Sequence, residues 1–168
     1  PYNDIYADVK DLKGQSILLE KSRVNFAIYE SVQAQNQIID RMNPTVYAKT
    51  QKNATEIENM KKAHIIDGVV MTKYIYWLKK NIGKIPMDEC SVADRLDQMR
   101  REHGALDISF NTISAYGKNA ALCHYHAVPE HCASLQARGL YLVDSGGQYY
   151  EGTTDITRTI ALGPVTDE

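Results

Sequence analysis

The feature that most constrains this chain is a pair of strand-like stretches joined by a short turn. Residues 139–143 are apolar and rich in residues that favour strands, and they lead into Asp144 and two glycines. Residues 152–159 are rich in Thr and Ile and also favour a strand, while residues 150–152, between the two stretches, have the chemistry of a turn. The pattern predicts a β-hairpin with Asp144 on one strand and Asp155 on the other.

A hairpin of this kind places two carboxylates close together. Two carboxylates a few ångströms apart repel, and one of them takes up a proton unless a cation lies between them. Hard divalent ions such as Mg²⁺ and Mn²⁺ prefer oxygen ligands, and paired carboxylates can bridge two metal ions. The spacing alone favours a metal site no more strongly than a simpler interpretation, in which Asp144 ends a strand and Asp155 is a solvated hairpin residue.

Two helices are predicted upstream of the hairpin, and the longer runs from Asn53 or Thr55 to about Lys80. Glutamates near its start and lysines near its end complement the helix dipole. We interpret His64, which lies in its apolar stripe, as a buried structural residue. The stripe contains Ile57, Met60, His64, Met71, Ile75 and Leu78, with Ile65, Val69 and Tyr76 beside it.

The second helix is predicted to begin at Ser91, where residues 91–94 resemble a capping box, and to end near Gly104. Residues 108–116 then predict a strand, followed by a turn at residues 117–119. Helices followed by strands indicate an α+β fold, in which two helices pack on one face of an antiparallel sheet.

Residues 1–48 predict a separate, short α/β piece. The Asn43-Pro44 pair interrupts its pattern, and we place a domain boundary near Ala48. The predicted elements of this piece are a strand at 16–20, a helix at 22–33 and a second short strand at 37–39.

A cluster of thiols and imidazoles follows the predicted 117–119 turn. Its members are Cys123, His124, His126, His131 and Cys132. Such residues can bind structural zinc, but the spacing lacks a Cys-x-x-Cys pair and fits no standard zinc motif. On a strand, His124 and His126 would share one face and Cys123 would lie on the other. We therefore do not expect a dedicated zinc site, and we expect Cys123, His126, His131 and Cys132 to be surface or loop residues.

The composition disfavours some partners. A net charge of −2 and a pI near 6.2 argue against a nucleic-acid partner held by bulk charge. No apolar run approaches the length of a membrane span, so no membrane partner is expected either. Three cysteines, an odd number, do not form a disulfide framework, which favours a reducing, cytoplasmic setting.

Three stretches in the same order carry a resemblance to a known family. The sequence Asp-Ser-Gly-Gly-Gln-Tyr at 144–149, followed by Gly-Thr-Thr-Asp-Ile-Thr-Arg-Thr at 152–159, resembles the two-aspartate metal signature of the Xaa-Pro aminopeptidases (aminopeptidase P). Residues 110–114 resemble the strand that opens that family's catalytic sheet, and residues 121–130 resemble its active-site histidine segment. These enzymes are pita-bread metallopeptidases, and the resemblance is greatest to their long, three-domain type.

The resemblance implies a fold and a division into domains. Residues 49–168 would be the N-terminal half of a catalytic pita-bread (creatinase/aminopeptidase) domain, so the expected fold is a partial pita-bread fold. Residues 1–48 would be the C-terminal part of a non-catalytic, creatinase N-like middle domain.

The resemblance also implies a reaction. Two divalent ions, most often Mn, would activate a water that hydrolyses the bond between an N-terminal residue and a following proline. Asp144 would bind one ion and Asp155 would bridge both, while His124 would contact the substrate or assist proton movement. Thr157 would not bind an ion but would help to position the metal-binding side chains. The implied partners are a peptide with proline in second position and a second copy of the enzyme, in a homodimer.

The family's metal site needs two Asp, one His and two Glu, and the His and both Glu lie beyond the point where this chain stops. We therefore expect the isolated chain to be metal-poor and to have little or no peptidase activity, with apolar surface and strand edges exposed. Two alternatives stay open. One is a different pita-bread hydrolase, such as a prolidase-type dipeptidase or a creatinase. The other is a non-catalytic peptide- or histone-binding module, against which the retention of both aspartates counts.

Overall fold

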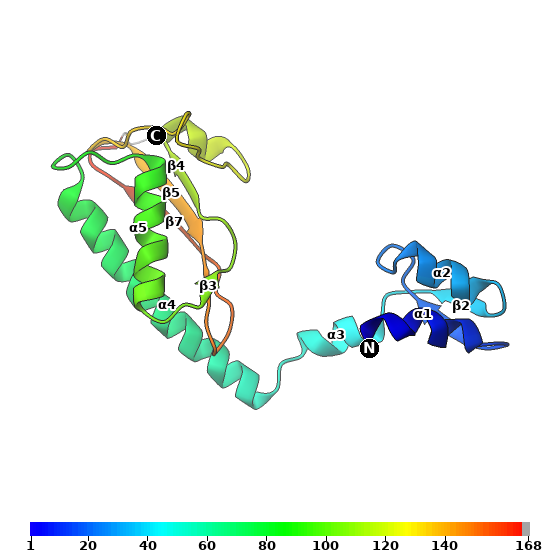
Figure 1. Ribbon diagram of the computed structural model, residues 1–168. Helices are drawn as coiled ribbons and strands as arrows, with labels where there is room; N and C mark the ends of the chain where they lie inside the picture. The colour runs from blue at the N-terminus through cyan, green and yellow to red at the C-terminus, as the bar shows by residue number, and fades with distance from the viewer. Residues whose placement is uncertain (166–168) are drawn as a thin grey trace. The chain divides into compact units, whose positions relative to one another are not determined.

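The computed structural model describes residues 1–165 and divides the chain into two compact units (Figure 1). The first unit is Pro1–Lys52 and the second begins at Asn53, so the division falls a few residues after Ala48. The division follows from local sequence, because the Asn53 side chain caps the long helix that opens the second unit.

The first unit contains a two-stranded parallel sheet and short helices. Both predicted strands and the predicted helix are present, although the helix begins at Phe26, after its cap Asn25, rather than at Ser22. The Asn43-Pro44 pair begins a short helix, because Asn43 accepts a hydrogen bond from the Thr45 N–H and Pro44 suits a first helical turn. The elements are η1 (Tyr2–Asp4), α1 (Ile5–Asp8), η2 (Val9–Asp11), β1 (Ser16–Leu19), α2 (Phe26–Gln33), β2 (Gln37–Asp40) and α3 (Pro44–Thr50).

The long helix α4 (Ala54–Asn81) confirms the predicted span, and Asn53 and Glu56 form a capping box at its start. The predicted apolar stripe is wrong in part. His64, taken as a buried residue, is exposed, and its Nδ1 lies 2.9 Å from the Met60 carbonyl oxygen. The buried face instead consists of Ala63, Asp67, Val70, Met71, Tyr74 and Leu78.

Helix α5 (Glu89–Glu102) begins earlier than predicted. Asp88 is its N-cap and accepts the Ser91 N–H at 2.7 Å, while the Ser91 hydroxyl accepts the Asp88 N–H at 2.9 Å. Ser91 therefore completes the capping box from inside the helix rather than starting it. The end of the helix is as predicted, with Gly104 following at a positive φ of 92°.

The second unit is α+β, as predicted, with the antiparallel sheet β4-β5-β7. The strand predicted over 108–116 consists of two shorter strands. One ends at Ile108 and the other begins at Ile113, and residues 109–112 belong to neither. The elements are β3 (Asp107–Ile108), β4 (Ile113–Tyr116), η3 (Gly117–Ala121), β5 (Leu140–Ser145), β6 (Gly147–Gln148) and β7 (Ile156–Ala161), with β3 paired to β6.

Helices α4 and α5 lie against one face of this sheet (Figure 1), and the main core forms between them. Alternation along β5 directs Tyr141 and Val143, both fully buried, into this core. Leu140, Leu142 and Asp144 lie on the opposite face, where Leu140 is 47% exposed. The helix-free face of the sheet is therefore the face that carries Asp144.

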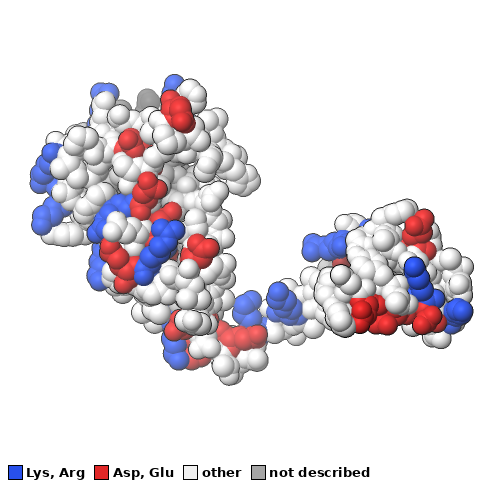
Figure 2. All heavy atoms as spheres, in the orientation of Figure 1, with Lys and Arg blue, Asp and Glu red and all other residues white. Residues whose placement is uncertain are grey.

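Charged side chains of both signs are distributed over the surface shown in Figure 2. Figure 2 shows basic and acidic side chains interspersed on the face it presents of each unit. Within residues 1–165, no helix combines the length and the apolar character that a membrane span requires.

Candidate active site

Asp144 lies near the end of β5, in the middle strand of the sheet, and is partly buried. In the antiparallel register it lies opposite Thr157 of β7 and opposite Ile113 of β4. Residues directly opposite one another share a face, so the three side chains belong to the helix-free face. The Thr157 hydroxyl donates a hydrogen bond to Asp144 Oδ1 at 2.7 Å, which fixes the orientation of that carboxylate.

Asp155 is exposed and directly precedes β7, so the prediction that it lies on a strand of the hairpin is wrong. The turn itself is present, because Tyr149 and Gly152 exchange two backbone hydrogen bonds of 2.9 and 3.1 Å. The chain departs from a simple hairpin at Gly146 and Gly147. There β5 ends and β6 leaves to pair with β3. A side chain at Gly146 would collide with the Thr154 carbonyl oxygen.

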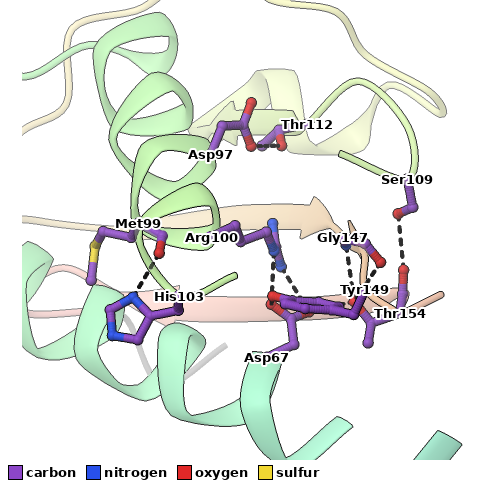
Figure 3. Close-up of polar contacts among 10 residues, drawn as sticks. All are labelled: Asp67, Asp97, Met99, Arg100, His103, Ser109, Thr112, Gly147, Tyr149 and Thr154. Atoms are coloured by element: carbon purple, nitrogen blue, oxygen red, sulfur yellow. Dashed lines mark hydrogen bonds and ion pairs between the residues drawn. The ribbon is translucent and has the colours of Figure 1, made fainter. Parts of the chain in front are cut away.

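A buried polar network holds the segment that leads to Asp155 (Figure 3). Thr154, fully buried, donates its hydroxyl proton to Asp67 Oδ2 at 2.6 Å, and Tyr149 donates to Asp67 Oδ1 at 3.0 Å. Arg100 of α5 pairs with the same carboxylate. Burial and the neighbouring Asp67 raise the pKa of Tyr149 well above its usual range, so the phenol remains a donor. The network fixes the backbone immediately before Asp155.

The sequence analysis missed this network. Its only signals were an acid within the apolar spacing of one helix, Asp67, and an arginine at the end of the next, Arg100. An arginine at the end of a helix usually points to solvent, whereas Arg100 is fully buried.

His124 is exposed and lies in an irregular loop, so its predicted position on a strand shared with His126 is wrong. It has a positive φ of 55°, a conformation that side-chain-bearing residues adopt infrequently. Among residues 1–165, no hydrogen bond joins His124 to Asp144 or Asp155. The structure therefore brings Thr157 to Asp144 but does not place His124 in contact with either aspartate.

Glu89 of α5 holds in place the loop at residues 117–133, which contains His124 and is called the histidine loop below. Fully buried, it accepts the Tyr116 N–H at 2.6 Å, the Ala133 N–H at 2.8 Å and the Tyr125 hydroxyl at 2.8 Å. The Asn119 amide contacts both of its oxygens, at 3.0 and 3.2 Å. Burial, followed by the hydrogen bond and charge of Glu89, raises the pKa of Tyr125 to about 12. One carboxylate thus fixes both ends of the loop and the residue next to His124.

The expected surface or loop positions are confirmed for Cys123, His126 and His131. Cys123, His124, His126 and His131 are exposed along the loop. Cys132 instead approaches Cys90 of α5, together with Asp88.

The donor set at Asp144 and Asp155 is suited to a hard cation. Among residues 1–165, neither carboxylate takes part in an ion pair with Lys, Arg or His. The carboxylate oxygens of Asp144 and Asp155 are the kind of ligand that Mg²⁺ and Mn²⁺ prefer, and the Thr157 hydroxyl orients the Asp144 carboxylate. Within residues 1–165, Asp144 and Asp155 do not form part of a group of three or more metal-ligating side chains whose ligand atoms lie within 4.8 Å of one another.

Comparison with known proteins extends this picture. Residues 58–168 match the profile of metallopeptidase family M24. Over 151 residues the chain is 42% identical to Xaa-Pro aminopeptidase 2 of Mus musculus, covering 89% of this chain and 22% of that protein. Over 163 residues it is 37% identical to the probable Xaa-Pro aminopeptidase P of Botryotinia fuckeliana, covering 95% of this chain and 25% of that protein.

Among solved structures, the chain matches X-prolyl aminopeptidase from Caenorhabditis elegans with a TM-score of 0.83 and 26% identity. That protein is described as a cytosolic enzyme with a di-nuclear active site. The match covers 99% of this chain and 29% of the nematode chain, so the predicted partial pita-bread fold is confirmed. The chain spans between roughly a fifth and a third of the length of the three relatives.

Proposed function

The chain belongs to metallopeptidase family M24, and from this premise we propose that it is part of an Xaa-Pro aminopeptidase. That enzyme would release the N-terminal residue of a peptide whose second residue is proline. In this proposal residues 49–168 supply the first half of the catalytic domain, and residues 1–48 end a non-catalytic middle domain. The enzyme would work in the cytoplasm as a homodimer.

The observation that carries the proposal is the arrangement around Asp144. Thr157 of β7 orients the Asp144 carboxylate of β5. Asp155 lies two residues before Thr157 on the same segment. Both acids lack an ion-pair partner among residues 1–165, and Asp144 lies on the face of the sheet that no helix covers. This is how a strand pair would present carboxylates to a pair of cations and to a substrate.

Asp144 and Asp155 would hold two divalent ions, Mn²⁺ in our proposal, together with one His and two Glu from the second half of the domain. Ions held there would supply an activated water and polarise the carbonyl of the Xaa-Pro bond. Thr157 would keep the Asp144 carboxylate directed at its ion.

His124 would contact the bound peptide or assist a proton transfer at the scissile bond. Its exposure leaves its ring free for such a contact, and the Glu89 anchor would fix the loop on which it is carried. The positive φ of His124 turns the chain sharply at this point.

Metal content and peptide hydrolysis test the proposal in two proteins, this chain and a version extended through the rest of the catalytic domain. The expected result is about two Mn²⁺ and cleavage of an Xaa-Pro-Xaa peptide by the extended protein, with neither property in the chain alone. Asp144→Asn in the extended protein should abolish cleavage. The exposed Asp8, which is outside the second unit, provides a matched Asp8→Asn control that should change nothing.

Two other outcomes would replace the proposal. Cleavage of free Xaa-Pro dipeptides, but not of longer peptides, would indicate a prolidase-type dipeptidase. An extended protein that binds no metal and cleaves neither substrate would indicate a peptide-binding module that has kept the two aspartates without their chemistry.

A further inference from the structure

A short antiparallel ladder brings two cysteines together at the start of α5. The Leu135 N–H donates to the Met87 carbonyl at 2.8 Å, the Glu89 N–H donates to the Ala133 carbonyl at 3.1 Å, and Asp88 lies opposite Ser134. Cys90 follows Glu89 in the first turn of α5, and Cys132 directly precedes Ala133 on the facing segment.

The side chains of Asp88, Cys90 and Cys132 lie close together. One ligand atom each from Asp88, Cys90 and Cys132 lies within 4.8 Å of the other two, and all three residues are partly buried. Within residues 1–165, this is the one group of three or more metal-ligating side chains that lies so close together. The segments involved are separated by more than forty residues of chain, so the fold itself assembles the group.

The chemistry of the group differs from that of Asp144 and Asp155. Thiolate sulfur is a soft ligand that selects Zn²⁺ over Mn²⁺ or Mg²⁺, and a single carboxylate oxygen is compatible with a zinc site. One oxygen of Asp88 accepts the Ser91 N–H, and Cys132 makes a 3.8 Å sulfur contact with the Pro129 carbonyl oxygen. A second Asp88 oxygen and both sulfurs remain to bind a cation.

We propose that Asp88, Cys90 and Cys132 form a binding site for a thiophilic divalent cation such as Zn²⁺, separate from the site at Asp144 and Asp155. Binding replaces the two thiol protons, which pass to solvent, and involves no redox change. Three protein ligands leave a fourth tetrahedral position for water. Cys90 also lines a cavity of about 380 Å³ between α5 and the loop that contains His126, which gives a cation a route to Cys90.

Occupancy of this site would tie the first turn of α5 to the end of the histidine loop. Glu89 lies between Asp88 and Cys90 in sequence and already anchors that loop at Ala133 and Tyr125. The cation would therefore reinforce the same connection, without contacting His124.

Co²⁺ is a suitable probe because thiolate ligation gives an intense sulfur-to-metal charge-transfer band that oxygen ligands do not give. The reduced chain should develop this band at one equivalent of Co²⁺, and one equivalent of Zn²⁺ should remove it. Loss of a residue that supports a metal ligand usually lowers metal affinity about 10–100-fold. Cys90→Ser and Cys132→Ser each remove a ligand itself, so each should weaken Co²⁺ binding by more than this. The exposed Cys123 provides the matched control, and Cys123→Ser should leave the band unchanged.

Two further variants separate this site from folding and from the proposed active site. Asp88→Asn retains a good N-cap, so α5 should stay folded by circular dichroism while Co²⁺ binding weakens. The double variant Asp144→Asn, Asp155→Asn should keep the full band. A band that persists in Cys90→Ser, or that is absent from the reduced wild-type chain, would overturn the proposal. So would a Cys90–Cys132 disulfide that re-forms at once after reduction and leaves no thiol to bind Co²⁺.

Discussion

Arg100 and Asp67 form a fully buried, two-point ion pair, with Nε to Oδ1 at 2.8 Å and Nη2 to Oδ2 at 3.2 Å. The pair joins α4 to α5, and its carboxylate also accepts hydrogen bonds from Tyr149 and Thr154 (Figure 3). Buried charges are tolerated only when they are paired and hydrogen-bonded, so the helices and the segment before Asp155 depend on the same four side chains.

Removing one charge of this pair should be strongly destabilising. Asp67→Asn leaves the Arg100 guanidinium buried without its counter-charge, and we expect the free energy of unfolding to fall by about 3–5 kcal/mol. Urea denaturation of the chain, followed by circular dichroism, measures this. The exposed pair of Arg95 and Glu102, 3.3 Å apart, is the control, and Glu102→Gln should cost at most about 1 kcal/mol. Equal losses in the two variants would contradict the assigned importance of burial.

Glu89→Gln should loosen the histidine loop. Glu89 faces donors from Tyr116, Asn119, Tyr125 and Ala133, and a glutamine would turn an N–H₂ group toward some of them. Hydrogen bonds to a charged group contribute about 1.5–3 kcal/mol each, so a loss of that order is expected.

Hydrogen exchange locates the effect of Glu89→Gln. The amide protons of Tyr116 and Ala133 should lose protection before the amides of β5 do, because their acceptor is the altered side chain. Glu130→Gln, on the exposed surface of the same loop, should leave both amides protected. Unchanged protection in Glu89→Gln would show that the loop is held by other contacts.

Alkaline pH should weaken the second unit through its buried tyrosines. Burial raises the pKa of Tyr141 to about 12, and its hydroxyl contacts Ser114 and Tyr74 at 2.9 and 3.0 Å. An unfolded tyrosine titrates near 10, so the folded state holds more protons between about pH 10 and 12. The stabilisation is therefore complete below about pH 10 and is lost as the pH rises through 12.

Urea denaturation at several alkaline pH values checks this dependence. Each proton of difference contributes a slope of about 1.4 kcal/mol per pH unit, and Tyr141→Phe should reduce the slope by up to that amount. Tyr150, which is 88% exposed, provides the control, and Tyr150→Phe should not alter the slope. An identical slope in wild type and Tyr141→Phe would contradict the assigned shift.

The sequence was sufficient where structure is set locally. The sequence predicted the start of α4 at Asn53 or Thr55, and Gly104 predicted the end of α5, because caps are formed by neighbouring residues. The buried face of α4 was not predictable in the same way. Asp67 is buried because Arg100 reaches it from another helix, and no window of local hydrophobicity contains that partner.

The candidate site shows the same difference between features set by local sequence and features set by contacts far apart in sequence. Motif resemblance identified Asp144, Asp155, Thr157 and His124, and antiparallel pairing then placed Thr157 against Asp144. Alternation failed for His124 because side-chain contacts to Glu89, rather than a ladder of backbone hydrogen bonds, determine its loop. Those contacts join residues far apart in sequence, which periodicity cannot detect.

The contact between Thr157 and Asp144 leads to a prediction that rests on the proposed function. Thr157→Val preserves the shape of the side chain but removes the hydroxyl that holds Asp144 Oδ1. In the extended protein we expect Mn²⁺ affinity and peptidase activity to fall by about 10–100-fold, the usual effect of losing a group that orients a ligand. Thr157→Ser restores a hydroxyl and should recover most of both properties.

Thr159→Val is the matched control, because Thr159 is an exposed threonine of β7 on the same face, opposite Leu142 rather than Asp144. It should change neither Mn²⁺ affinity nor activity. A metal titration read by electron paramagnetic resonance separates the two quantities, because free Mn²⁺ gives a sharp signal that disappears on binding. If Thr157→Val and Thr159→Val behave alike, the hydroxyl has only the general role of a strand residue. A selective loss of Mn²⁺ affinity in Thr157→Val, recovered by Thr157→Ser, would tie the hydrogen bond to metal binding rather than to folding.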